Sequence, residues 1–188
     1  RVAMPGDGVY KSTDGGATWQ HMGLPDSHHI ARIVIHPRNP DVVYVAAMGH
    51  LFSPNEERGI FKTSDGGRTW TKALFVNDTT GGIDLVMNRR QPDTLYAATY
   101  QVQRYPWRLV EGGPGTGIHK TTDGGRTWTR LEGGLPRGPM GRIGLDICRS
   151  NPNILYARIE HEKQGGVYRT DDAGSSWRKM GSHNGRPM

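Results

Sequence analysis

STDGGATW, at residues 12–19, is the first of four copies of an eight-residue phrase that decides the fold of this chain. The phrase returns as TSDGGRTW at 63–70, as TTDGGRTW at 121–128 and as TDDAGSSW at 170–177. The shared pattern is S/T-x-D-x-G-x-S/T-W, and we call each copy a box turn. A phrase that repeats at a spacing of about 50 residues indicates an array of similar structural units.

Each box turn is interpreted as the turn of a β-hairpin, because a short apolar run precedes it and a polar, alternating stretch follows it. The Asp side chain can accept hydrogen bonds from backbone N–H groups, and the glycines can adopt positive φ angles. The Trp can then carry a large apolar area into the space beneath the hairpin. We therefore interpret eight residues as structural, rather than as catalytic carboxylates or calcium ligands: Asp14, Trp19, Asp65, Trp70, Asp123, Trp128, Asp172 and Trp177.

A second phrase, rich in Pro and Asn, repeats between the box turns at 37–46, 90–98 and 150–157. It predicts a tight turn between two apolar strands, so that each unit contains four strands. The box turns are 51, 58 and 49 residues apart, which is typical of the four-stranded antiparallel blades of a β-propeller. The sequence therefore predicts an all-β fold, a partial β-propeller over residues 1–188, with a half blade at 8–22 and blades at 30–74, 82–131 and 142–180.

The predicted three and a half blades are too few for a closed ring, which usually needs roughly four or more. We expect the chain to be a fragment of a larger propeller, since it starts at Arg1 and ends at Arg186-Pro187-Met188, where another strand should begin. An alternative stays open, in which two copies of the chain complete a seven-bladed ring. The expected partners therefore include the rest of the parent propeller or a second copy.

The composition agrees with a turn-rich all-β chain, with 27 Gly, 12 Pro and 34% hydrophobic residues. The net charge of +6 does not indicate nucleic-acid binding, because Lys and Arg recur once or twice in each hairpin instead of forming one basic stripe. The single cysteine, Cys148, excludes an internal disulfide and is expected to be a small buried residue. No transmembrane run or signal peptide is visible, and we expect neither membrane insertion nor a cofactor.

The box turn resembles the Asp box, or BNR repeat, of sialidase-like and sortilin-like propellers. The wider sequence resembles the sortilin-type, VPS10-like N-terminal propeller of large exported bacterial proteins, through DSHHI at 26–30, NEERG at 55–59 and GRIGLD at 141–146. This resemblance covers essentially the whole chain and implies a propeller that is extracellular or periplasmic. It implies less about function, because such repeats serve enzymes and non-enzymes alike.

Binding is expected where the units differ, at the longer and more irregular loops that share one end of the predicted blades. The longest insertion, at 101–116, carries the candidate ligand-binding residues Tyr105, Trp107, Arg108 and Glu111. An aromatic platform flanked by Arg and Glu suits a sugar ring or an extended peptide. The alternative is that the two aromatic rings pack the loop onto its own blade.

Four histidines are further candidates for ligand binding at the same end: His28, His29, His50 and His161. A metal site needs three or more converging ligands, and spacing across blades cannot establish that convergence. We therefore assign no metal site, and structural or surface roles remain the alternative for these histidines.

Asp84 and Asp146 lie on predicted inner strands and are the candidate catalytic residues. A pair of carboxyl groups in the central channel could perform acid–base catalysis on a glycosidic bond. The alternative is that these carboxylates pair with Arg32 or Arg142, or solvate the channel.

The sequence favours a non-catalytic binding propeller of sortilin-like type, which recognises a peptide, a protein or a glycan on its loop-rich end. The alternative is a glycoside hydrolase of the xyloglucanase-like or sialidase-like class of Asp-box propellers. A sialidase is the least favoured, because neither its arginine triad with a Tyr nucleophile nor its Arg-Ile-Pro phrase can be assigned here. The ligand and the total number of blades do not follow from the sequence.

Overall fold

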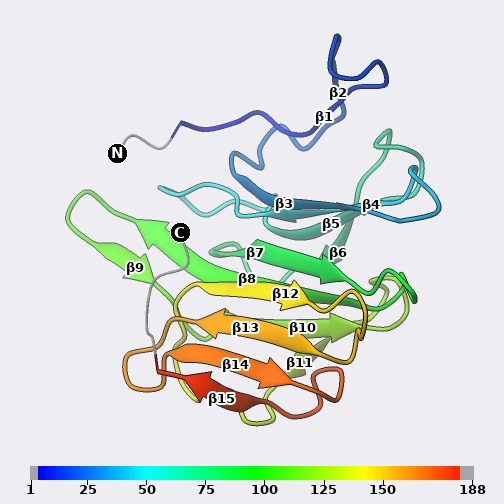
Figure 1. Ribbon diagram of the computed structural model, residues 1–188. Coiled ribbons are helices and arrows are strands. Elements are labelled where there is room, and N and C mark those ends of the chain that lie inside the picture. Colours follow the sequence, from blue (N-terminus) through cyan, green and yellow to red (C-terminus); the bar gives the residue numbers. More distant parts are fainter. Residues whose placement is uncertain (1–3, 183–188) are drawn as a thin grey trace.

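The computed structural model describes residues 4–182, which form β-strands and loops with no helix among them. The strands gather into three antiparallel sheets of the propeller-blade type and one short hairpin, and these follow one another in chain order from top to bottom of Figure 1. The predicted all-β fold with four-stranded antiparallel blades is therefore confirmed. Residues 1–3 and 183–188, which include both ends used to predict a fragment, lie outside the described residues.

The strands of each sheet pair with their neighbours in the sequence, with one exception in the second blade. The short hairpin contains β1 (Tyr10–Lys11) and β2 (Gln20–His21). The first blade contains β3 (Ile30–Ile35), β4 (Val43–Ala47), β5 (Gly59–Thr63) and β6 (Thr71–Leu74). The second contains β7 (Thr80–Met87), β8 (Leu95–Arg104), β10 (Gly117–Thr121) and β11 (Thr129–Leu131), with β9 (Leu109–Glu111) added to β8. Here β10 pairs with β8, and the intervening β9 pairs with β8 alone. The third contains β12 (Ile143–Ile147), β13 (Leu155–Ile159), β14 (Gly166–Thr170) and β15 (Arg178–Gly181).

The box turns share one hydrogen-bond pattern, which the turn at 63–70 illustrates. Asp65 Oδ1 accepts from the Thr69 backbone N–H at 3.0 Å and from the Thr63 hydroxyl at 2.7 Å, and Asp65 Oδ2 accepts from the Thr69 hydroxyl at 2.6 Å. The other three copies repeat these bonds. The pKa of the box aspartates is lowered mainly by the hydrogen bond from the hydroxyl at the seventh position of the box turn. For Asp14 and Asp172 this pKa falls to about 2. Each carboxylate therefore holds its own turn together.

We expect the fold to lose stability in acid because of these four aspartates. Their pKa values in the folded chain lie below the ordinary value of about 4 that the unfolded chain retains. Their contribution is therefore complete above about pH 4 and is lost as the pH falls through about 2. Urea titrations followed by tryptophan fluorescence at a series of pH values should show a falling free energy of unfolding over this window. A constant value between pH 4 and pH 2 would contradict the structural role.

Neighbouring blades are joined by one repeated contact. The Tyr44 hydroxyl on β4 donates to the Gly124 carbonyl in the box turn of the next blade at 3.0 Å, and a lysine on β5 donates to the same carbonyl. The Tyr96 hydroxyl on β8 donates in the same way to Ala173, again beside a lysine. Tyr44 and Tyr96 are each 1% exposed, whereas Tyr156, the third copy, is 40% exposed. Each of the first two blades thus donates two side-chain hydrogen bonds to the box turn of the next blade.

The sequence predicted that all four box tryptophans lie beneath their hairpins, but the structure shows this for only some of them. Trp177 is buried, and Trp70 and Trp128 are half-buried, with Trp70 Nε1 donating to the Met22 carbonyl at 2.6 Å. The prediction is wrong for Trp19, which is 63% exposed. The later box turns lie against the preceding blade, but the described residues contain no blade in front of β1. A tryptophan in this position is therefore covered by the neighbouring blade and not by its own hairpin alone.

The hydrophobic core is divided among the junctions between blades. Along β4, Tyr44 and Ala46 belong to a cluster shared with β7, whereas Val45 and Ala47 belong to a cluster shared with the β1–β2 hairpin. A third cluster lies between the second and third blades. This alternation with period two buries both faces of a blade. The packing of the blades also brings the inner strands β3, β7 and β12 side by side, with β7 in the middle.

Candidate functional site

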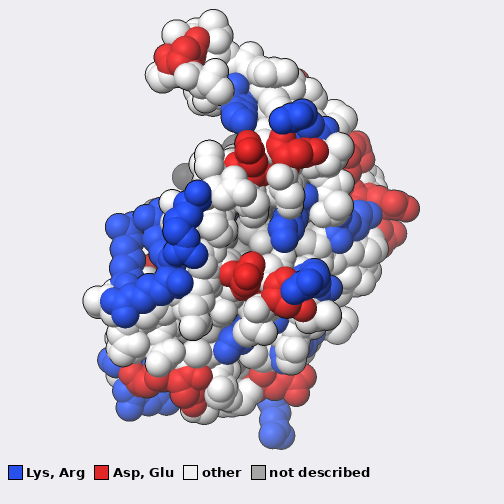
Figure 2. Space-filling model, turned by 90° about the vertical axis from the view of Figure 1, so that its right-hand side faces the viewer, with Lys and Arg blue, Asp and Glu red and all other residues white. Residues whose placement is uncertain are grey.

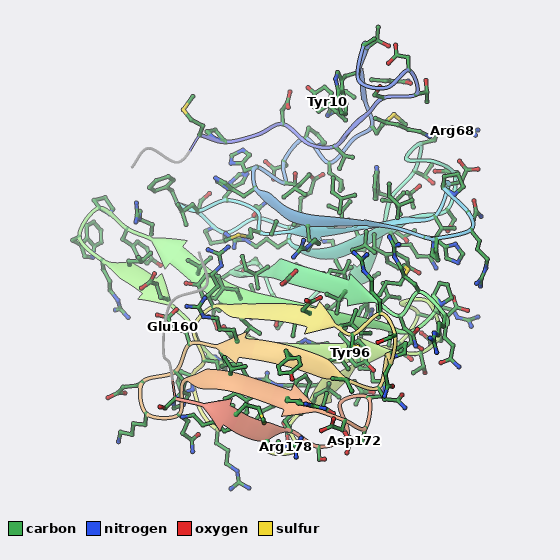
Figure 3. All side chains as sticks on the ribbon, viewed as in Figure 1. Tyr10, Arg68, Tyr96, Glu160, Asp172 and Arg178 are labelled. Atoms are coloured by element: carbon green, nitrogen blue, oxygen red, sulfur yellow. The ribbon has the colours of Figure 1, made fainter. Side chains whose placement is uncertain are left out.

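The loops of the described chain divide between two ends of the blades. Arg68 and Asp172, in box turns, are labelled on the right of Figure 3, and Glu160, in a loop of the third blade, on the left. At the left end the loops bond to one another. The Arg104 N–H donates to the Leu51 carbonyl at 2.8 Å, and the Gly141 N–H donates to the Glu160 carbonyl at 2.8 Å. The longer loops therefore form one continuous surface, which we call the loop-rich end.

The insertion at 101–116 is a projecting hairpin and not the loop that the sequence predicted. Strand β8 continues to Arg104 and pairs with β9 in the register Val102↔Glu111 and Arg104↔Leu109. Sequence patterns missed β9 because it is three residues long and ends in Glu111 before a Gly-Gly pair. The pairing carries the tip of the hairpin away from the blade, on the left of Figure 1.

The hairpin tip carries an exposed aromatic pair. Tyr105 and Arg108 close the turn, with the Tyr105 N–H donating to the Arg108 carbonyl at 2.7 Å. The rings of Tyr105 and Trp107 lie 5.9 Å apart and 22° from parallel. Trp107 is 82% exposed and Tyr105 is 36% exposed, so the Trp107 ring contacts its neighbour rather than the body of the blade. Arg108, at the tip, and Glu111, farther along β9 and opposite Val102, are also exposed. The pair offers a flat apolar surface to solvent.

A buried arginine organises the loop between β4 and β5. Arg58 is fully buried, and its guanidinium donates to the Asn55 side-chain oxygen at 2.9 Å, to the Ser53 carbonyl at 3.0 Å and to the His50 carbonyl. A buried cation is tolerated when its donors are satisfied in this way. The guanidinium therefore fixes the backbone from His50 to Ser53, and the Asn55 side-chain oxygen also accepts from the His50 N–H at 2.9 Å.

Two of the predicted histidines meet in space, together with a carboxylate. The His28 and His50 rings stack at 3.7 Å, and His50 Nε2 lies 2.7 Å from Asp26 Oδ1. Burial, and then the neighbouring His50, lowers the pKa of His28 below its usual range. The side chains come from the loops before β3 and after β4. We call Asp26, His28 and His50 the histidine cluster.

The other two predicted histidines hold loops in place. His29 Nδ1 lies 3.0 Å from the Gly49 carbonyl, and His161 Nε2 lies 3.0 Å from the Arg137 carbonyl. Sequence reasoning did not select Asp26, although it stands two residues before His28. The only available signal was this proximity, because the loop that brings His50 is remote in the sequence.

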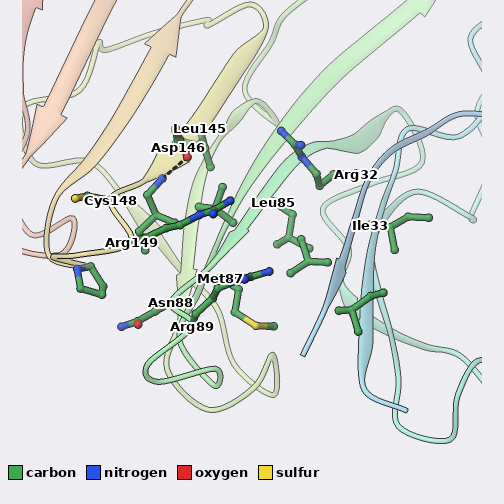
Figure 4. A pocket seen from close by; sticks show the side chains of 15 residues that line it. Arg32, Ile33, Leu85, Met87, Asn88, Arg89, Leu145, Asp146, Cys148 and Arg149 are labelled. Atoms are coloured by element: carbon green, nitrogen blue, oxygen red, sulfur yellow. Dashed lines mark hydrogen bonds between the residues drawn. The ribbon is translucent and has the colours of Figure 1, made fainter. Parts of the chain in front are cut away.

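The inner strands of the three blades border a groove of about 670 Å³ (Figure 4). Arg32, Arg89 and Arg149 line it together with Asp146 and apolar side chains of β3, β7 and β12. Cys148, which was expected to be buried, is half-buried on its wall. The arginines give this groove a basic lining.

The two candidate catalytic carboxylates have different surroundings. Asp84 is 7% exposed, and its Oδ1 accepts from Arg32 Nε at 2.9 Å and from the Leu85 N–H at 2.9 Å. Its Oδ2 accepts from the Leu145 N–H on β12 at 2.8 Å. Asp146 is exposed, and its Oδ1 accepts from the N–H of the next residue. Asp84 thus joins three inner strands, whereas the Asp146 carboxylate is open to the groove.

Charged side chains of both signs cover the end that carries the box turns. Figure 2 faces this end and shows Asp and Glu among Lys and Arg, with one group of basic side chains gathered at its left. Among residues 4–182 there is no helix of the length and apolarity needed to cross a membrane.

Comparisons with known proteins agree with the propeller fold. The chain is 25% identical over 223 residues to the probable oligoxyloglucan-reducing end-specific xyloglucanase of Neosartorya fischeri, covering 90% of this chain and 26% of that relative. It therefore spans about a quarter of the length of this relative. The crystal structure of an ancestral GH74 enzyme matches with a TM-score of 0.74 at 18% identity, over 96% of this chain and 22% of that one. The structure of YCF48 bound to D1 peptide matches with a TM-score of 0.51 at 18% identity, over 86% and 42%.

The family model described as "Sortilin, neurotensin receptor 3" matches residues 7–137, which cover the first blade and the second blade with its hairpin. This match spans more than half of the chain and confirms the sortilin-type resemblance. The chain belongs to the Sortilin-Vps10 family.

Proposed function

We propose that this chain is part of the propeller of a xyloglucanase-type glycoside hydrolase and binds a β-glucan chain at its loop-rich end. The exposed pair of Tyr105 and Trp107 carries this proposal. The apolar faces of sugar rings pack on exposed aromatic rings, and a rigid hairpin presents such rings at little entropic cost. On the same hairpin, the Arg108 guanidinium can donate hydrogen bonds to sugar hydroxyl groups and the Glu111 carboxylate can accept them.

The similarity to a xyloglucanase supports the hydrolase alternative better than the non-catalytic receptor that the sequence favoured. In this proposal the chain holds substrate. Asp84 has no catalytic part in it, because both of its oxygens are engaged in joining strands. Asp146 remains the candidate acid–base group, since its carboxylate is exposed to the groove. A protein with this role would work outside the cell or in the periplasm, where it meets polysaccharide.

Binding of xyloglucan oligosaccharides to the 188-residue chain tests the proposal. Isothermal titration calorimetry with a xyloglucan oligosaccharide should give saturable binding. The same titration with an unsubstituted β-glucan oligosaccharide of equal backbone length gives a second dissociation constant, and the ratio of the two measures the preference for side-chain sugars. Release of reducing ends from xyloglucan, measured in parallel, reports whether this chain alone can hydrolyse it.

Neurotensin, the peptide named in the description of the family, is the competing probe. A non-catalytic peptide receptor, which is one form of the binding propeller that the sequence favoured, would bind the peptide and not the oligosaccharides. That result would overturn the proposal and favour the hypothesis of a non-catalytic binding propeller.

A further inference from the structure

The histidine cluster contains three donors of the kinds that transition metals prefer. One ligand atom from each of Asp26, His28 and His50 lies within 4.8 Å of the other two. Two imidazoles and one carboxylate form a donor set typical of Zn²⁺ and other first-row divalent ions. Because the donors come from two different loops, an ion bound by all three would connect those loops.

The surrounding residues orient two of the donors. His50 Nδ1 lies 2.8 Å from the Ser53 hydroxyl, which leaves Nε2 free to face Asp26. The Asn55 side-chain N–H₂ donates to the Asp26 carbonyl at 2.8 Å and to Asp26 Oδ2 at 3.2 Å. Metal-binding histidines and carboxylates are usually held in this manner by a second layer of hydrogen bonds.

His28 is the third donor. Within residues 4–182 no hydrogen bond holds its half-buried ring, and its aromatic contacts are the stacked ring of His50 and the edge of His29. Its backbone adopts a φ of 49°, a conformation that is uncommon for a residue other than glycine. An imidazole binds a metal through its edge, so the ring must rotate out of the stack, and it breaks no hydrogen bond in doing so.

We propose that Asp26, His28 and His50 bind one divalent transition-metal ion, with Zn²⁺ as the ion to test first. Three protein ligands leave a coordination position for water, which is the arrangement of an open zinc site. The ion fastens the loop before β3 to the loop after β4, at the loop-rich end of the first blade. This site is independent of the proposed function, because it uses none of the residues of the hairpin.

Calorimetric titration of the untagged chain with ZnCl₂ tests the site, and Co²⁺ absorption spectra report the ligand geometry. We expect one ion per chain and a rise in the melting temperature on addition of Zn²⁺, since the ion binds only the folded loops. Asp26→Asn, His28→Gln and His50→Gln should each weaken Zn²⁺ binding at least about 100-fold, because losing a ligand costs more than losing an outer hydrogen bond. His21→Gln, which removes an exposed histidine outside the cluster, should leave binding unchanged.

His28→Gln is the decisive variant, because it removes no hydrogen bond formed among the described residues and should keep the fold. Circular dichroism confirms folding of each variant before titration. Unchanged Zn²⁺ affinity in folded His28→Gln, or the absence of saturable binding of Zn²⁺, Co²⁺ and Ni²⁺ to the original chain, would overturn the proposal.

Discussion

Replacing Asp84 with alanine should lower the free energy of unfolding by about 2–6 kcal/mol. The substitution leaves the buried N–H groups of Leu85 and Leu145 without their acceptor, and each such loss costs about 1–3 kcal/mol. The loss of the Arg32 contact adds less, because the Arg32 side chain is 50% exposed and its partner is replaced by water. The expected effect is large because one side chain serves three strands.

Asp146→Ala is the matched control for this prediction. Asp146 also lies on an inner strand and also accepts from the N–H of the residue after it, but none of its described hydrogen bonds reaches a neighbouring blade. Its removal should cost no more than about 0.5 kcal/mol, as for most exposed positions. Urea unfolding of both variants, followed by circular dichroism, measures the difference. Equal stabilities would show that the contact between β7 and β12 contributes little.

Replacing Trp107 with alanine should weaken binding of a xyloglucan oligosaccharide by about 30-fold, which corresponds to about 2 kcal/mol for a central aromatic contact. The ring is 82% exposed, so its loss should leave the stability of the fold unchanged. Calorimetric titration of the variant and of the original chain gives the two dissociation constants.

Trp19→Ala provides the control for this second experiment. Trp19 is also a largely exposed tryptophan, but it lies in the first box turn, between β1 and β2, and not in the projecting hairpin at 101–116. Its removal should leave glycan binding unchanged. If both variants bound as tightly as the original chain, the hairpin would have no part in binding and the proposed role of Tyr105 and Trp107 would be wrong.

The fold could be predicted from sequence because the repeated information is local. An Asp, two hydroxyls and two small residues within eight positions define a turn, and the same bonds recur in all four copies. The exposure of Trp19 could not be predicted in this way, since it depends on the neighbouring blade and not on the turn itself. Strand β9 was missed for the related reason that its pairing with β8 has no repeat elsewhere among residues 4–182.

The histidine cluster marks the limit of prediction for the site. His28 and His50 were recognised as belonging to one end of the blades, but their convergence depends on the path of a loop that the buried Arg58 sets. Asp84 shows the same limit, because its bond to Leu145 joins residues 61 positions apart in the sequence. A contact that occurs once among the described residues, as these two do, leaves no repeated pattern in one sequence.

The repeated contact between a tyrosine and the following box turn has a consequence for how the chain opens. Its stability is a sum of terms for single blades and for the junctions between them. The second blade has a junction on each side, whereas the third offers the exposed ring of Tyr156 to solvent on its outer side. Local unfolding should therefore start in the β1–β2 hairpin and in the third blade, at the two ends of the array, and reach the second blade last. The amide protons of β7 and β8 should then exchange most slowly.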